Sequence, residues 1–287
     1  MSHGTLVVVR AGALTTVQDL GRYGHAALGV ARSGALDGPA HRLANRLAGN
    51  PAGAATLETT LTGVAVRAGR ALTAVVTGAP AAVRVDGRPA AWAEPVHVPA
   101  GAVLDIGPAT SGVRSYIAVS GGVAVPEVLG SRSADLLSGL GPAPLADGDV
   151  LPLGAPAGPP VHTDLPPWQG PPGELVLPVL LGPRDDWFNR AALRTLTAGH
   201  WTVSPHSNRI ALRTVGPALE RAVARELPSE GMVVGAVQVP PDGRPVLFLA
   251  DSPTTGGYPV IGVVPERHLA PAAQAAPGLP VRFTLLR

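Results

Sequence analysis

The sequence predicts a mainly β protein built from two similar halves. Short runs of β-branched and other apolar residues recur along the whole chain. Its 36 glycines and 32 prolines lie between these runs, where they favour turns, and are not gathered into one disordered tract. A segment beginning LETT in the first half also resembles one beginning LPSEG in the second half.

The aligned segments place Glu58 on Glu230, and a glycine follows each glutamate five residues later, at Gly63 and Gly235. In both segments a short apolar run, a Gly-Arg pair and a second apolar run come next. We interpret this as internal duplication of a β-rich unit. Chance matching among Ala, Val and Gly is the alternative.

The apolar runs are typical of short strands, and Asp86-Gly87 predicts a tight hairpin turn because both residues tolerate positive φ. Helical spacing is rarer. It occurs at 35–49, with Asp37 as N-cap and Gly49 as the end, and at 185–198. Each half is therefore expected to be a β-barrel or sandwich with about one helix. The main predicted strands are 6–9, 71–78, 114–121, 174–181, 245–251 and 281–286.

The segment 154–173 is the densest in Pro and Gly, so it predicts an extended connector. It separates an N-terminal domain, 1–153, from a C-terminal domain, 174–287. Both lengths suit single domains.

Composition excludes several kinds of chemistry. The chain has no Lys, and hence no Schiff-base, P-loop or biotinyl lysine, and no Cys, and hence no thiolate nucleophile or Cys-ligated zinc. The eight His residues lack metal-ligand spacing, so no metal site is expected. The net charge is +2, and there is no basic stripe or apolar run of about 18 residues. We expect a cytoplasmic protein that binds neither nucleic acid nor membrane.

Polar residues cluster between positions 15 and 37, among several glycines. Glycine lets backbone N–H groups approach a ligand, and Arg can bind a carboxylate through two donors. The alternative is structural: Asp19 pairs with Arg22, Asp37 only caps a helix and His25 is a surface residue. The cluster comprises Gln18, Asp19, Arg22, His25, Arg32, Ser33 and Asp37.

Glu58 lies in an apolar run, so it is either exposed at a strand end or buried with a partner, and a buried carboxylate is a candidate base. Glu230 is its counterpart, next to Ser229. Three glycine-bearing turns, 119–122, 130–133 and 254–258, are either anion-binding nests or ordinary hairpins. In the second half, Asn208, Arg209, Gln238 and Asp251 add polar groups beside predicted strands.

Several multi-residue motifs follow one another in order between about residues 5 and 286. They are TTVQDLGRYGHAALGVARSGALD, GNPAGAATLETTLTG, YIAVSGGVAVPEVLGSRS, SNRIALR and PSEGMVVGAVQVPPDGRPVLFLADSPTTGGYPVIGVV. Through these motifs the sequence resembles the family of KipA and the C-type subunits of 5-oxoprolinase, also called allophanate hydrolase subunit 2, which is related to the carboxyltransferase domain of urea carboxylase.

This resemblance implies two tandem cyclophilin-like β-barrels. It also implies a B-type (KipI-like) partner subunit and, in 5-oxoprolinase, an A-type subunit, with ATP bound together with these partners. The implied reaction is opening of the 5-oxoproline lactam to L-glutamate. Transfer of a carboxyl group to urea or another amide, with biotin on a separate carrier, is one alternative. A regulatory protein that binds a kinase inhibitor, or an inert module, is another.

By motif, the resemblance implies three catalytic candidates, Glu58, Glu230 and Asp19. It also implies that the substrate, a small amide or lactam, is bound by residues from both halves, which we expect to converge on one cleft. Family members usually continue the SNR motif with a Met-Gly-type turn, whereas this chain has Ile210-Ala211. The substrate-binding candidates are Gln18, Arg22, Asp37, Asn208, Arg209, Ser229, Gln238, Thr254, Thr255 and Tyr258.

Overall fold

A computed structural model describes residues 4–162 and 173–286 and divides them into two compact units. Unit 1 comprises 4–22, 33–135 and 139–162; unit 2 comprises 23–32, 136–138 and 173–286. The mainly β fold is confirmed. The domain boundaries at 153 and 174 stay a prediction, and most of the connector, 163–172, lies outside the described residues.

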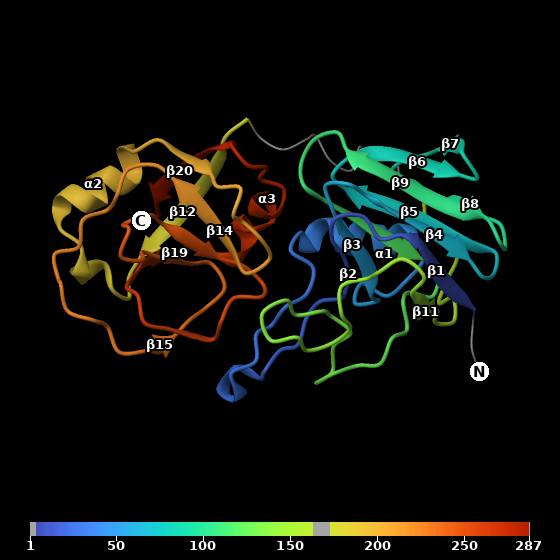
Figure 1. Cartoon of the computed structure of the whole chain (residues 1–287), viewed down its shortest axis with the longest axis horizontal. Coiled ribbons are helices and arrows are strands. Elements are labelled where there is room, and N and C mark those ends of the chain that lie inside the picture. The colour runs from blue at the N-terminus through green and yellow to red at the C-terminus, as the bar shows by residue number, and fades with distance from the viewer. Residues whose placement is uncertain (1–3, 163–172, 287) are drawn as a thin grey trace. The chain divides into compact units, whose positions relative to one another are not determined.

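Unit 1 consists of two antiparallel sheets (Figure 1). The predicted hairpin is confirmed, because β6 and β7 pair across Asp86 and Gly87, whose φ angles are 48° and 77°. The six-stranded sheet has the order β11(Val150–Pro152), β1(Thr5–Arg10), β4(Val64–Ala68), β9(Val103–Ala109), β6(Ala81–Val85), β7(Arg88–Ala90). The five-stranded sheet has the order β2(Thr15–Gln18), β3(Thr56–Thr60), β10(Arg114–Val119), β5(Leu72–Gly78), β8(Val96–Val98).

Both sheets contribute to the main core of unit 1. Val8 and Ile106 come from one sheet, and Leu57, Val76 and Ile117 from the other. The opposite face of the five-stranded sheet is covered by the helix α1(Gly38–Leu47). The sequence spacing predicted this helix and its N-cap, since the Asp37 carboxylate accepts from Ala40 N–H at 3.0 Å.

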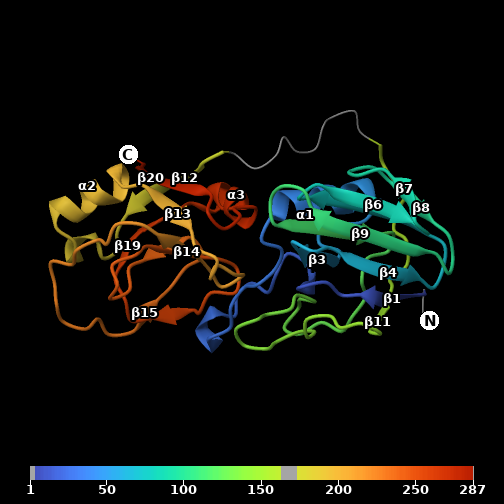
Figure 2. The ribbon, with the colours of Figure 1, turned by 45° about the horizontal axis from the view of Figure 1, so that its top comes forward.

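Unit 2 contains a closed seven-stranded barrel. Figure 2 shows β20 beside β12 and β13, with which it pairs. Trp201 and Phe283 meet edge to face inside it, with ring centroids 6.0 Å apart. The barrel order is β12(Leu175–Leu181), β19(Val260–Val263), β16(Ala236–Gln238), β17(Val246–Phe248), β14(Ala211–Val215), β13(Trp201–Val203), β20(Pro280–Leu285).

The remaining elements of unit 2 lie outside the barrel. Asn189 caps α2, the predicted second helix, through Ala192 N–H at 2.8 Å. No helix among the described residues has the length and apolar character needed to cross a membrane. These elements are α2(Arg190–Ala198), α3(Ala270–Ala273), the paired strands β15(Glu230–Gly231) and β18(Thr255–Gly256), and the 3-10 turns Ala26–Leu28, Asp185–Trp187 and Glu266–His268.

The proposed duplication holds for element order but not for pairing. Gly63 and Gly235 both have positive φ, and a strand follows each. However, β16 and β17 pair with each other, whereas their counterparts β4 and β5 lie in different sheets. Short apolar runs fix the existence of strands, but pairing depends on contacts between distant residues.

Candidate active site

Unit 1 contains a buried polar layer between its five-stranded sheet and α1. Because strand side chains alternate, Thr16, Glu58 and Tyr116, which are register partners, share one face of the sheet. Leu57 and Ile117 point into the apolar core on the other face. The predicted residues Gln18, Glu58 and Asp37 therefore meet on or beside the polar face.

Glu58 is held at the centre of this layer and is only 1% exposed. Its Oε2 accepts from the Tyr116 hydroxyl at 2.8 Å and from Leu36 N–H at 3.1 Å. Its Oε1 lies 3.6 Å from Arg114 Nε. The Tyr116 hydroxyl in turn accepts from Asp37 N–H at 2.8 Å. Of the two interpretations of Glu58, the buried and partnered one is correct.

Burial, followed by the charges of Glu58 and Asp37, raises the pKa of Tyr116 well above its usual range. The phenol therefore stays protonated and keeps donating to Glu58. Charge-assisted hydrogen bonds of this kind fix the position of a carboxylate. The arrangement fixes the Glu58 carboxylate beneath the N-terminal end of α1.

His41 and Asn45 extend the polar layer along α1. His41 Nδ1 lies 2.9 Å from Thr56 Oγ1, and Asn45 Nδ2 lies 3.3 Å from His41 Nε2. Burial lowers the pKa of His41 from 6.5 to about 4. The imidazole is therefore neutral at pH 7.

Asp19 follows β2, and its carboxylate accepts hydrogen bonds from the 130–133 turn. Its Oδ1 accepts from the hydroxyls of Ser131 and Ser133, both at 2.6 Å, and its Oδ2 accepts from Arg132 N–H at 2.6 Å. Burial raises the pKa of Asp19, but these bonds and one from Gly21 N–H outweigh burial and leave the pKa lowered. Of the two interpretations of the 130–133 turn, an anion nest or an ordinary hairpin, its donors match the nest, and the anion they bind is the chain's own Asp19 carboxylate.

Three polar atoms near Asp19 are buried and have no hydrogen-bond partner within the described part of the chain: Gln18 Oε1, Arg22 Nη1 and Ser33 Oγ. Arg22 Nη2 donates to the Ser133 carbonyl, and Gln18 Nε2 donates to the next carbonyl, of Ala134, at 3.1 Å. Ser33 also has a φ of 54°, which is strained for serine. Unpartnered buried groups and backbone strain both concentrate at functional sites.

In unit 2, Arg209 forms a bidentate ion pair with Asp251. Nε to Oδ2 is 2.9 Å and Nη2 to Oδ1 is 3.0 Å, and both side chains are fully buried. Asn208 accepts from the N–H groups of Ile210 and Ala211 and so closes the turn before β14. Asn208 and Arg209 thus make structural contacts in this unit.

The other candidates of unit 2 gather around β15 and β18, which pair Glu230 with Gly256. Glu230 is half-buried and binds Arg184, whose hydrogen bonds lower the pKa of Glu230. Ser229 and Thr255 are exposed, and Thr254 is half-buried. Gln238 Nε2 donates to the carbonyl of Tyr258 at 3.2 Å.

The structure therefore groups the predicted residues within each unit, and their convergence on one cleft stays a prediction. Sequence reasoning missed several partners of these residues. The sequence pattern does not distinguish Tyr116 from the apolar residues of its strand. It indicated the 130–133 turn as a candidate anion nest, but not that Asp19 is the anion. Among residues 4–162 and 173–286, no group of three or more His, Asp or Glu side chains is placed to hold a metal. The missed partners are Arg114, Tyr116 and Arg184, and the pairing of Ser131 and Ser133 with Asp19 was also missed.

Comparison with known families accounts for this architecture. Residues 28–285 match the family described as "Carboxyltransferase domain, subdomain A and B". The chain belongs to this family. The resemblance inferred from the motifs is confirmed, since the chain is 39% identical to the C-type subunit of Escherichia coli 5-oxoprolinase over 97% of its own length and 90% of that protein.

Other known proteins are similar to nearly all of the chain. The C-type subunit of 5-oxoprolinase from Haemophilus influenzae is 32% identical, with 93% of this chain and 87% of that protein covered. The crystal structure of the K. lactis urea amidolyase matches with a TM-score of 0.91 and 30% identity, covering the whole chain but 19% of the amidolyase. The solved protein TTHA0988 matches with a TM-score of 0.88 and 38% identity, and this chain spans 56% of it.

Proposed function

We propose that the chain is the C-type subunit of an ATP-dependent 5-oxoprolinase, which works with B-type and A-type subunits to open the lactam of 5-oxoproline to L-glutamate. The two bacterial 5-oxoprolinase subunits support this, because the alignment covers 90% and 87% of their lengths. Their names imply further subunits.

The observation that carries the proposal is the buried polar layer of unit 1 together with the unpartnered buried atoms beside it. A lactam has one N–H donor and one carbonyl acceptor. Gln18 Oε1 can accept from such an N–H, and Arg22 Nη1 can donate to a carbonyl or carboxylate oxygen; both atoms are buried and unpartnered within the described residues. These groups are chemically complementary to an amide.

Glu58 is a better candidate than Glu230 for accepting a proton from the attacking water. Glu58 is buried and positioned by Tyr116 and Leu36. Glu230 is half-buried, and its pairing with Arg184 lowers its pKa, which makes it a weaker base. Asp19 is saturated by four donors and serves to hold the 130–133 turn in place.

Neither a P-loop nor the two glycine-bearing turns of unit 1 offers a triphosphate site. There is no P-loop lysine. The 130–133 turn is filled by Asp19, and at the 119–122 turn Gly121 N–H donates to Asn50 Oδ1 at 2.9 Å. We therefore assign ATP to the partner subunits.

Carboxyl transfer to urea or a related amide is the second candidate. It is favoured by the family match and by the TM-score of 0.91 to the K. lactis urea amidolyase. Because the chain has no lysine, biotin would arrive on a separate carrier.

Co-expression with B-type and A-type subunits, followed by an assay of substrate-dependent ADP release, separates these functions. We expect 5-oxoproline to stimulate ADP release by the purified complex. Turnover with urea and a biotinylated carrier, but not with 5-oxoproline, would contradict the proposal. Binding of the B-type subunit without any turnover would instead favour a regulatory, KipA-like role.

A further inference from the structure

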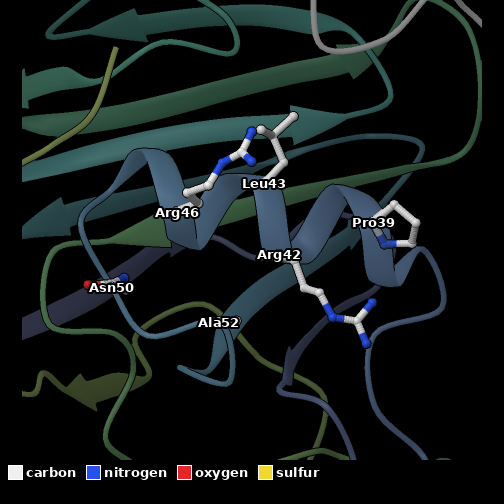
Figure 3. A pocket seen from close by; sticks show the side chains of 6 residues that line it. All are labelled: Pro39, Arg42, Leu43, Arg46, Asn50 and Ala52. Atoms are coloured by element: carbon white, nitrogen blue, oxygen red, sulfur yellow. The ribbon is translucent and has the colours of Figure 1, made fainter. Parts of the chain in front are cut away.

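A pocket of about 390 Å³ lies on the outer side of α1. Figure 3 shows that Pro39, Arg42, Leu43 and Arg46 line it from the helix, whereas Asn50 and Ala52 come from the segment that follows. This volume lies within the range of small-molecule sites. No residue proposed for lactam chemistry lines it.

Arg42 and Arg46 give the pocket its charge. Both are exposed, and within the described part of the chain neither forms a hydrogen bond or an ion pair. Several other arginines with exposed side chains are paired, as Arg10 is with Asp105 and Arg282 with Glu174. Residues 38–57 contain no Asp or Glu, so this part of the sequence supplies no acid to neutralise them.

The other polar side chains near the pocket form hydrogen bonds within the chain or are buried. Asn50 Nδ2 donates to Asn45 Oδ1 at 3.1 Å and to the Val119 carbonyl at 2.8 Å, and its Oδ1 accepts from Gly121 N–H. His41 is a buried residue of α1 itself, and its imidazole is neutral at pH 7. The two guanidinium groups are therefore the groups available to a ligand, and they are cationic.

We propose that this pocket binds a small molecule that carries two or more phosphate or carboxylate groups. Guanidinium groups bind such oxygens through paired N–H donors. In Figure 3 the two guanidinium groups point in different directions, which suits separate anionic groups on one molecule better than a single anion. Pro39 and Leu43 add an apolar wall. This inference is independent of the function proposed for unit 1.

Calorimetric titration of the full chain at low salt tests the site, with pyrophosphate and citrate as probes and inorganic phosphate as the single-anion comparison. We expect one equivalent of pyrophosphate or citrate to bind, and phosphate to bind at least about tenfold more weakly. Arg42→Gln and Arg46→Gln are each expected to weaken binding about tenfold, and the double variant to abolish it.

The matched control is the double variant Arg84→Gln/Arg88→Gln. It removes the same charge from exposed positions of unit 1 outside the pocket, and it should bind like the wild type. The proposal is overturned if neither probe binds the wild type, or if both double variants lose affinity equally, which would indicate attraction by net charge alone. Thermal unfolding of each variant without ligand confirms that it is folded.

Discussion

The carboxylate of Glu58 is fixed in place by partners from distant parts of unit 1. Tyr116, Leu36 N–H and Arg114 surround its carboxylate, and burial keeps the phenol protonated. Removing one partner of a buried charged group costs more than the bond itself, because the remaining group stays desolvated. The sequence identified Glu58 from its motif, but its partners come from residues 22 and 58 positions away.

His41 makes stability depend on pH. Burial lowers its pKa to about 4, so the folded state binds fewer protons than the unfolded state between pH 6.5 and 4. This contribution is present above pH 6.5 and is lost as the pH falls through 4. We expect a loss of about 3 kcal/mol between pH 7 and pH 4.

Comparison with His41→Gln isolates that effect. Urea unfolding at several pH values should show that the free energy of unfolding falls more steeply with decreasing pH for the wild type than for the variant. Parallel curves would contradict a buried neutral imidazole.

The helix α1 links the candidate active site to the anion pocket. Its N-cap residue, Asp37, also donates its N–H to Tyr116, while Arg42 and Arg46 lie on its outer side. Sequence spacing predicted this helix because its leucines, cap and terminal glycine are local signals. It did not predict β15 and β18, two-residue strands that exist only through their mutual pairing.

Asp37→Ala tests whether Asp37 acts as a cap. We expect a loss of about 1 kcal/mol in the free energy of unfolding, and a similar loss for Asn189→Ala, which removes the cap of α2. Asp37→Ser should restore most of the stability, since serine also caps helices. A much larger loss that serine does not restore would show that the Asp37 charge is required, and denaturant titration measures both variants.

At the scale of the whole molecule, composition and motifs predicted the mainly β fold and the family, both of which are confirmed. They did not predict that 23–32 and 136–138 belong to unit 2. Arg32 binds Glu266 at 2.9 Å and Leu136 N–H donates to Asp251 at 3.2 Å. Such long-range contacts have no local signature. The same holds for the Arg209–Asp251 pair, whose members are 42 residues apart.

The most direct measurement is 5-oxoproline-dependent ADP release by the complex of this chain with the proposed B-type and A-type subunits, carrying either Glu58→Gln or Glu230→Gln. If Glu58 is the base, Glu58→Gln lowers the rate at least about 100-fold while the complex still co-purifies, and Glu230→Gln retains most of the rate. A Glu58→Gln complex that turns over 5-oxoproline at nearly the wild-type rate would contradict the catalytic role of the buried polar layer.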